Sequence, residues 1–148
     1  MFDYHALAPE MILGVTLLAV LAIDLVLPER LKYLAGVTAL VGMVAAAFPL
    51  LTIAFCDSIS GCTDTGARVM FGGSYAIDDF ALVLKGLFLV SGVISLLLSV
   101  GYLESDDYYQ GEFYFLVLAS VTMAVVMASS RDLITIFVGL ELVSAPAF

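Results

Sequence analysis

The stretch YLAGVTALVGMVAAAFPLLTIAF, residues 33–55, decides the fold because its 23 residues carry no charge. A helix needs about 20 predominantly apolar residues to cross the hydrocarbon core of a bilayer. The stretch is therefore predicted to be a membrane-spanning helix, bent near its far end by Pro49. The whole chain of 148 residues is 63% hydrophobic and only 13% charged, which leaves too few charges to solvate a globular surface. This composition argues against an independent soluble enzyme.

Four further apolar segments flank this one, and together they predict an all-α polytopic membrane protein. Charged residues, glycines or a proline separate each segment from the next. The predicted spans are residues 9–27, 31–55, 80–103, 113–130 and 133–148. The last segment has 16 residues, short of the about 20 needed to cross. We therefore expect a chain that continues beyond Phe148, with a short buried helix as the alternative.

The segment 56–79 is rich in glycine and polar residues and is predicted to be a loop on the outer side. Within it, RVMFGGSYAID (68–78) places two glycines between short apolar stretches, which predicts a β-hairpin outside the bilayer. Cys56 and Cys62 form either a disulfide or two free thiols. The Lys and Arg residues divide evenly between the two sides, so orientation depends on the cysteine-containing loop, which favours the oxidising side. The N-terminus is then also expected outside.

The charge balance and the missing motifs exclude several classes of function. A net charge of −9 argues against nucleic-acid binding and against a polybasic membrane anchor. The sequence has no glycine-rich nucleotide motif and no Cys or His set suited to an iron–sulfur or haem site. We therefore expect no cofactor on this chain.

Glu141 is the strongest candidate for a functional residue. It lies eight residues beyond Leu133, about 12 Å along a helix, which places it near the middle of the hydrocarbon core. An ionisable residue at that depth is costly and marks a functional site by default. The alternative is a neutral glutamate that hydrogen-bonds a neighbouring helix as a packing device.

Two other charged residues lie within predicted spans. Lys85 is about 7.5 Å into the third span, where it either anchors the helix by extending to the interface or relays protons. Asp24 is close to the end of the first span and is expected to be solvated at the interface. Lys85 and Glu141 could neutralise each other only across a depth difference of about 4–5 Å.

The order of these features resembles one known family. The first span begins with Pro-Glu, the third with DDFALVLKGLFL (78–89), and the chain ends with MASSRDLITIFVGLELVSAPAF (127–148). These stretches are similar to the subunit N family of bacterial NADH:quinone oxidoreductase, or respiratory complex I, the counterpart of mitochondrial chain 2. The resemblance covers the whole sequence and about the N-terminal third of a family chain. It implies the first five transmembrane helices of an antiporter-like fold.

The resemblance also implies a role for Glu141. The family glutamate in Gly-Leu-Glu falls on this residue and pairs with a lysine on a later helix, beyond Phe148. Alternation between a tight ion pair and a separated state would move protons, with Lys85 as a second, weaker candidate for proton translocation. Ser144 and Pro146 match small and helix-bending family residues and are expected to be structural.

The function implied is that of a non-redox, proton-translocating membrane-arm subunit that couples quinone reduction to proton pumping. Its expected partners are the lipid bilayer of a bacterial inner membrane and other membrane-arm subunits of complex I. Flavin, iron–sulfur clusters and quinone are expected in other subunits. Two alternatives stand: a subunit of a multi-subunit cation/proton antiporter, and a small structural scaffold.

Overall fold

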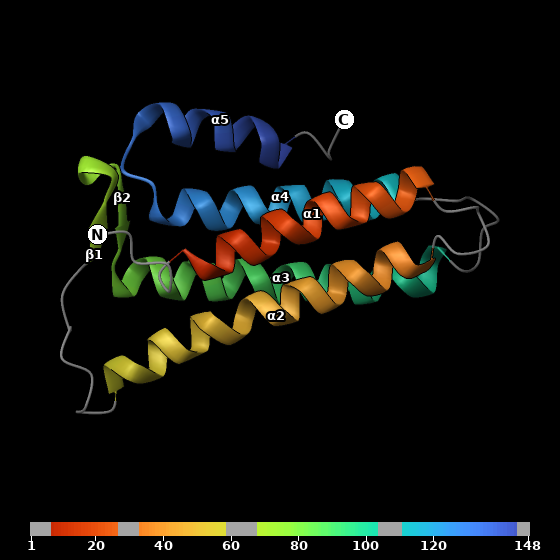
Figure 1. Cartoon of the computed structure of the whole chain (residues 1–148), viewed down its shortest axis with the longest axis horizontal. Helices are drawn as coiled ribbons and strands as arrows, with labels where there is room; N and C mark the ends of the chain where they lie inside the picture. The colour runs from red at the N-terminus through yellow and green to blue at the C-terminus, as the bar shows by residue number, and fades with distance from the viewer. Residues whose placement is uncertain (1–6, 27–32, 59–67, 104–110, 145–148) are drawn as a thin grey trace.

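A computed structural model describes residues 7–26, 33–58, 68–103 and 111–144, and these form a bundle of helices with a small hairpin at one end (Figure 1). The helices are α1 (Ala8–Val26), α2 (Tyr33–Ser58), α3 (Asp79–Leu103), α4 (Gly111–Ser129) and α5 (Leu133–Ser144). The first four are long and apolar enough to cross a membrane, whereas α5 has only 12 residues. The predicted fold class, an all-α polytopic membrane protein, is confirmed.

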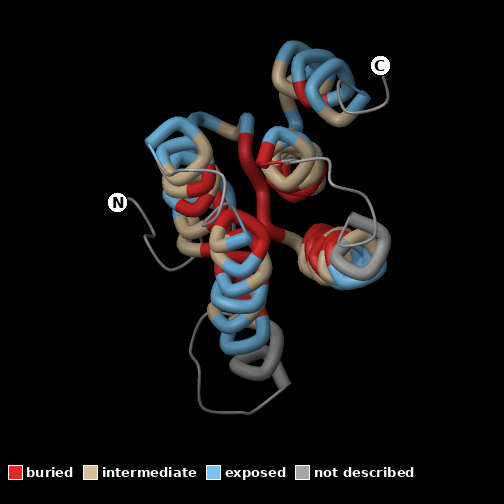
Figure 2. The backbone as a smooth tube through the Cα atoms, turned by 90° about the vertical axis from the view of Figure 1, so that its right-hand side faces the viewer, coloured by how far each residue is buried: buried red, intermediate tan, exposed pale blue. Residues whose placement is uncertain are grey.

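The helices pack in a closed arrangement in which α4 touches all the others. α1 and α3 each lie between α2 and α4, and α5 packs mainly on the outer side of α4 (Figure 1). Buried residues line the centre of the bundle, and exposed ones cover its outside, α5 above all (Figure 2). Many of the exposed side chains are large and apolar, for example Leu18 and Phe48. Contact between such an apolar surface and water is unfavourable, whereas contact with lipid is not.

Glycines allow the helices to approach one another closely. A Cβ atom on Gly42 of α2 would lie within 2.1 Å of the Thr16 side chain of α1. A Cβ on Gly92 of α3 would come within 2.6 Å of Val121 on α4. Membrane helices associate through such small residues because lipid tails provide no hydrophobic force between helices.

The predicted β-hairpin is confirmed. Strand β1 (Arg68–Met70) pairs antiparallel with β2 (Tyr75–Ile77), and the short 3-10 segment η2 (Phe71–Gly73) connects them. Gly72 and Gly73 have φ angles of 67° and 104°, a region that side-chain-bearing residues rarely adopt. The two glycines therefore permit the tight reversal.

The hairpin is docked onto the connection between α4 and α5. Tyr75 of β2 pairs with Ser130 in an antiparallel bridge. The amide of Arg131 donates a hydrogen bond to the carbonyl of Ser74 at 2.8 Å. The guanidinium of Arg131 forms an exposed ion pair with Asp78 at 3.0 Å. The segment Ser-Ser-Arg-Asp before the last span thus holds the hairpin.

Asp24 lies near the end of α1, as the sequence predicted, and is half-buried, so its carboxylate is only partly open to solvent. Its Oδ1 atom is buried, and a Cβ on Gly111 would lie within 1.8 Å of that atom. The carboxylate therefore lies against the first residue of α4. A negative charge at the N-terminus of a helix is favourable because the unpaired backbone amides there carry partial positive charge.

Several predictions concern residues outside those that the structure describes. They are the start of the second predicted span at 31–32, the thiol or disulfide of Cys62, and the end of the fifth predicted span at 145–148, which includes Pro146. The side chain of Cys56 is also outside the described part.

Candidate functional site

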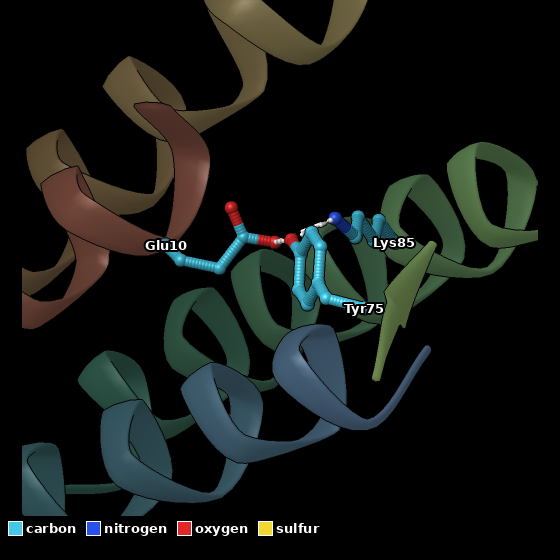
Figure 3. A network of polar contacts seen from close by, with 3 residues as sticks. All are labelled: Glu10, Tyr75 and Lys85. Carbon is cyan, nitrogen blue, oxygen red and sulfur yellow. Dashed lines mark hydrogen bonds and ion pairs between the residues drawn. The ribbon is translucent and has the colours of Figure 1, made fainter. Parts of the chain in front are cut away.

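The candidate site is a buried ion pair between Lys85 and Glu10 at the hairpin end of the bundle (Figure 3). Lys85 Nζ lies 2.5 Å from Glu10 Oε1, and the two side chains are 1% and 10% exposed. The pair joins α3 to α1. Bringing two charges out of water is costly, and close pairing with further hydrogen bonds offsets that cost.

Tyr75 completes the site by bonding both charged groups. Its hydroxyl donates to Glu10 Oε1 at 2.6 Å and accepts from Lys85 Nζ at 2.9 Å. The ring reaches the pair from β2, as Figure 3 shows. We call these three residues, Glu10, Tyr75 and Lys85, the buried triad. It carries one negative and one positive charge, and is neutral when the tyrosine is protonated.

The electrostatics of the triad keep the phenol protonated. Burial, and then the neighbouring Glu10 carboxylate, raise the pKa of Tyr75 above its ordinary value. The buried Ser129 side chain of α4 lies beside the same phenol and opposes this shift weakly. Tyr75 is thus a permanent hydrogen-bond donor to the carboxylate at neutral pH.

One oxygen of Glu10 lacks a hydrogen-bond partner within the described part of the chain. Oε1 accepts the hydrogen bonds from Tyr75 and Lys85, whereas Oε2 is buried and has no hydrogen-bond partner among the described residues. A buried acceptor without a partner is costly, and a proton or an ordered water relieves that cost. This oxygen is therefore the place in the triad where a further hydrogen-bond donor would be accepted.

Local sequence explains how each residue reaches the site. Glu10 lies in the first turn of α1, directly after buried Pro9. Lys85 lies six residues after Asp79, the first residue of α3, which is about 9 Å along the helix. Both residues are near the end of the bundle where the hairpin lies, and Tyr75 on β2 can therefore reach them.

The structure corrects the interpretation of Lys85 as an interfacial anchor. That interpretation required the side chain to extend to water, but the ammonium is buried and paired. Lys85 pairs with Glu10 and not with Glu141, in agreement with the difference in depth that the sequence indicated between Lys85 and Glu141. Sequence reasoning missed Glu10 and Tyr75. The signal was Lys85 itself, because a lysine inside an apolar helix requires a named counter-charge.

Glu141 lies apart from the triad, on α5. Its side chain is exposed, and its carbonyl accepts a hydrogen bond from the Ser144 hydroxyl at 2.9 Å. The surrounding surface of α5 is apolar, with Phe137 65% and Leu140 56% exposed. A carboxylate on an apolar helix face needs a partner from another helix or a proton.

The residues that the structure describes contain no group of three or more His, Cys, Asp or Glu residues that could hold a metal ion. The site is an arrangement of proton-carrying groups, a carboxylate, a phenol and an ammonium. Such groups can hold and pass protons.

No protein-family model matches the chain. The similar proteins that comparison finds nevertheless carry closely related names. NADH-quinone oxidoreductase subunit N 2 of Streptomyces griseus is 38% identical over 146 residues, which are 99% of this chain and 26% of that protein. NADH-quinone oxidoreductase subunit N of Anoxybacillus flavithermus is 36% identical over 149 residues, 99% of this chain and 28% of that protein. NAD(P)H-quinone oxidoreductase subunit 2 of Synechococcus elongatus is 31% identical over 140 residues, 95% of this chain and 25% of that protein.

A solved structure agrees with these relatives. A chain of respiratory complex I from Thermus thermophilus, determined with bound aureothin, superposes with a TM-score of 0.69 at 26% identity. The match covers 93% of this chain and 27% of that chain. The present chain spans between a quarter and a third of the length of the curated relatives it matches. Over nearly its whole length, therefore, the chain is similar to about a quarter of proteins named NADH-quinone oxidoreductase subunit N.

Proposed function

We propose that the chain is part of a proton-translocating membrane-arm subunit of NADH:quinone oxidoreductase. The observation that carries this proposal is its similarity, across 99% of its length, to proteins named subunit N of that enzyme. Four helices able to cross a membrane and a buried ion pair between two of them support it. Ionisable residues within membrane helices mark ion and proton pathways.

In this proposal Glu141 and Lys85 are the groups that hold translocated protons. Glu141 would face a cationic partner from a later part of the longer protein, and Lys85 would exchange with Glu10. When a cation approaches, the ionised carboxylate is favoured, and when it withdraws, the protonated form is favoured. Alternation between these states moves protons, and coupled groups titrate as a unit.

The chain itself would carry no redox chemistry. Flavin, iron–sulfur clusters and quinone would belong to other subunits, and other membrane-arm subunits would be its direct partners. The subunit would lie in a bacterial inner membrane with its N-terminus and the hairpin on the outer side. A membrane-impermeant thiol reagent applied to intact, reduced cells should then label Cys62. Labelling only after the membrane is opened would reverse this orientation.

The test of the function is the substitution Glu141→Gln, which keeps the size and removes the titratable group. We expect an assembled complex whose proton pumping falls, with quinone reduction falling too where the two are tightly coupled. Glu112→Gln is the matched control, because Glu112 is also an exposed glutamate but lies at the start of α4. The measurement is NADH:quinone turnover and vesicle acidification, normalised to assembled complex.

Two results would contradict the proposal. Wild-type pumping by Glu141→Gln would make this glutamate a packing residue. Purification of the native protein without a flavin and iron–sulfur arm, together with cation/proton exchange in vesicles, would assign it to an antiporter instead.

A further inference from the structure

We infer that Tyr75 is a positioning residue that links the Glu10–Lys85 pair to the start of α5, the helix that carries Glu141. The inference rests on the proposed function, since that function is what gives Glu141 a proton to hold. It adds a physical connection between two protonatable sites that lie on different helices.

The first part of the connection is the side chain of Tyr75. Its hydroxyl bonds Glu10 of α1 and Lys85 of α3 at 2.6 and 2.9 Å. The ring is 8% exposed, so water offers no ready replacement for these bonds. The position of the ring therefore depends on both charged groups.

The second part is the backbone of the hairpin. Tyr75 pairs with Ser130, and the neighbouring carbonyl of Ser74 accepts a hydrogen bond from the amide of Arg131 at 2.8 Å. Backbone pairing of this kind transmits a displacement because neither segment can move without losing hydrogen bonds. A shift of the tyrosine ring is thus expected to displace the backbone of residues 130 and 131.

The third part joins these residues to α5. The Ser130 hydroxyl contacts both the amide and the carbonyl of Asp132 at 3.3 Å. Asp132 in turn accepts bonds from the Thr135 hydroxyl at 3.2 Å and from the Ile136 amide at 3.0 Å. Asp132 therefore caps the first turn of α5, and the hairpin holds the residues directly before that cap.

Two sets of contacts hold α5: the attachment at residues 130–132 and its packing on α4. Among the described helices α5 packs mainly on α4, where Gly139 lies against Met127 and the Ser120 hydroxyl donates to the Val143 carbonyl at 3.2 Å. Figure 2 shows α5 on the outside of the bundle, with most of its surface exposed. A rearrangement of the buried triad is consequently expected to displace the first turns of α5 and, with them, Glu141.

The test is Tyr75→Phe, which retains the ring and removes only the hydroxyl, examined in the assembled membrane complex. Amide hydrogen exchange of Arg131 reports on the hairpin attachment directly, because that amide donates to Ser74. We expect exchange there to become about tenfold faster, and proton pumping to fall several-fold while the KM for quinone is unchanged. Tyr33→Phe, at the exposed start of α2, should alter neither exchange nor pumping.

Each outcome bears on the inference. Unchanged exchange at Arg131 would overturn it, and so would faster exchange with wild-type pumping. Should Tyr75→Phe not assemble, Lys85→Met removes one of the two bonds to the phenol, and exchange of the Arg131 amide alone is then the readout, because Lys85 is itself proposed to hold a proton. Wild-type pumping by Glu141→Gln would refute the proposed function alone, since the exchange of Arg131 would still report whether the connection exists.

Discussion

The buried Glu10–Lys85 pair makes a quantitative prediction about stability. Removal of one member of a buried ion pair costs about 3–5 kcal/mol, because the other charge is left without compensation. In Glu10→Gln the ammonium of Lys85, which is 1% exposed, keeps only the neutral Tyr75 hydroxyl and the new amide as partners. We therefore expect this variant to lose about 3–5 kcal/mol of the free energy of unfolding. Lys85→Met leaves a carboxylate that can take up a proton and keep its bond to Tyr75, so we expect about 2–3 kcal/mol.

The double variant distinguishes the energy of the Glu10–Lys85 pair from the energy of the other contacts that each side chain makes. Glu10→Gln with Lys85→Met removes both charges, and we expect its free energy of unfolding to lie within about 1 kcal/mol of the wild type. The coupling energy of the cycle is then about 4 kcal/mol or more in magnitude, far above the about 0.5 kcal/mol typical of independent sites.

The assay is unfolding of the purified protein in mixed micelles, followed by loss of helical circular dichroism. Ser95→Ala is the control, because the Ser95 hydroxyl bonds only its own helix on an exposed face, and its effect should stay within about 0.5 kcal/mol. Additive effects of the two single substitutions would refute the reasoning, since they would show that Glu10 and Lys85 do not stabilise each other.

Three further predictions follow from other contacts. Gly42→Ala should lower the free energy of unfolding by about 1–3 kcal/mol, because the added methyl group collides with Thr16. Gly14→Ala is the control and should leave that free energy unchanged in the same assay, because the space around Gly14 is open. Asp24→Asn should lower the free energy of unfolding by about 0.3–1 kcal/mol through loss of charge at the start of α4, and an unchanged value would show that the charge is unimportant. The raised pKa of Tyr75 means that the folded state favours the neutral phenol, so the wild type should lose stability above pH 10.0 more steeply than Tyr75→Phe; equal slopes would contradict the burial of this group.

Length and local composition were sufficient to predict four helices long enough to cross a membrane and the hairpin. The uncharged run at 33–55 exceeds the thickness of a bilayer, and Gly72 and Gly73 supply the backbone conformations that a tight reversal needs. These features depend on residues close in sequence. The fold class was therefore predictable from the chain alone.

The triad was not predictable in the same way. Glu10 and Lys85 are 75 residues apart, and their contact depends on how α1 and α3 are packed around α4. Tyr75 depends in addition on the docking of the hairpin against Ser130. The depth of Lys85 showed only that a counter-charge was required. The contact of Asp24 with Gly111 was unpredictable for the same reason, because Gly111 belongs to a helix more than 80 residues away.

The peripheral position of α5 has a consequence for how the protein acquires its structure. The main apolar core is built from residues of α1, α2, α3 and α4, and no residue of α5 belongs to it. Cooperative units of a protein open and close together when they share such a core. The four-helix bundle should therefore form one such unit, and α5 should join it in a separate, weaker transition. A chain shortened after Ser130 should accordingly retain the first transition and lose the second.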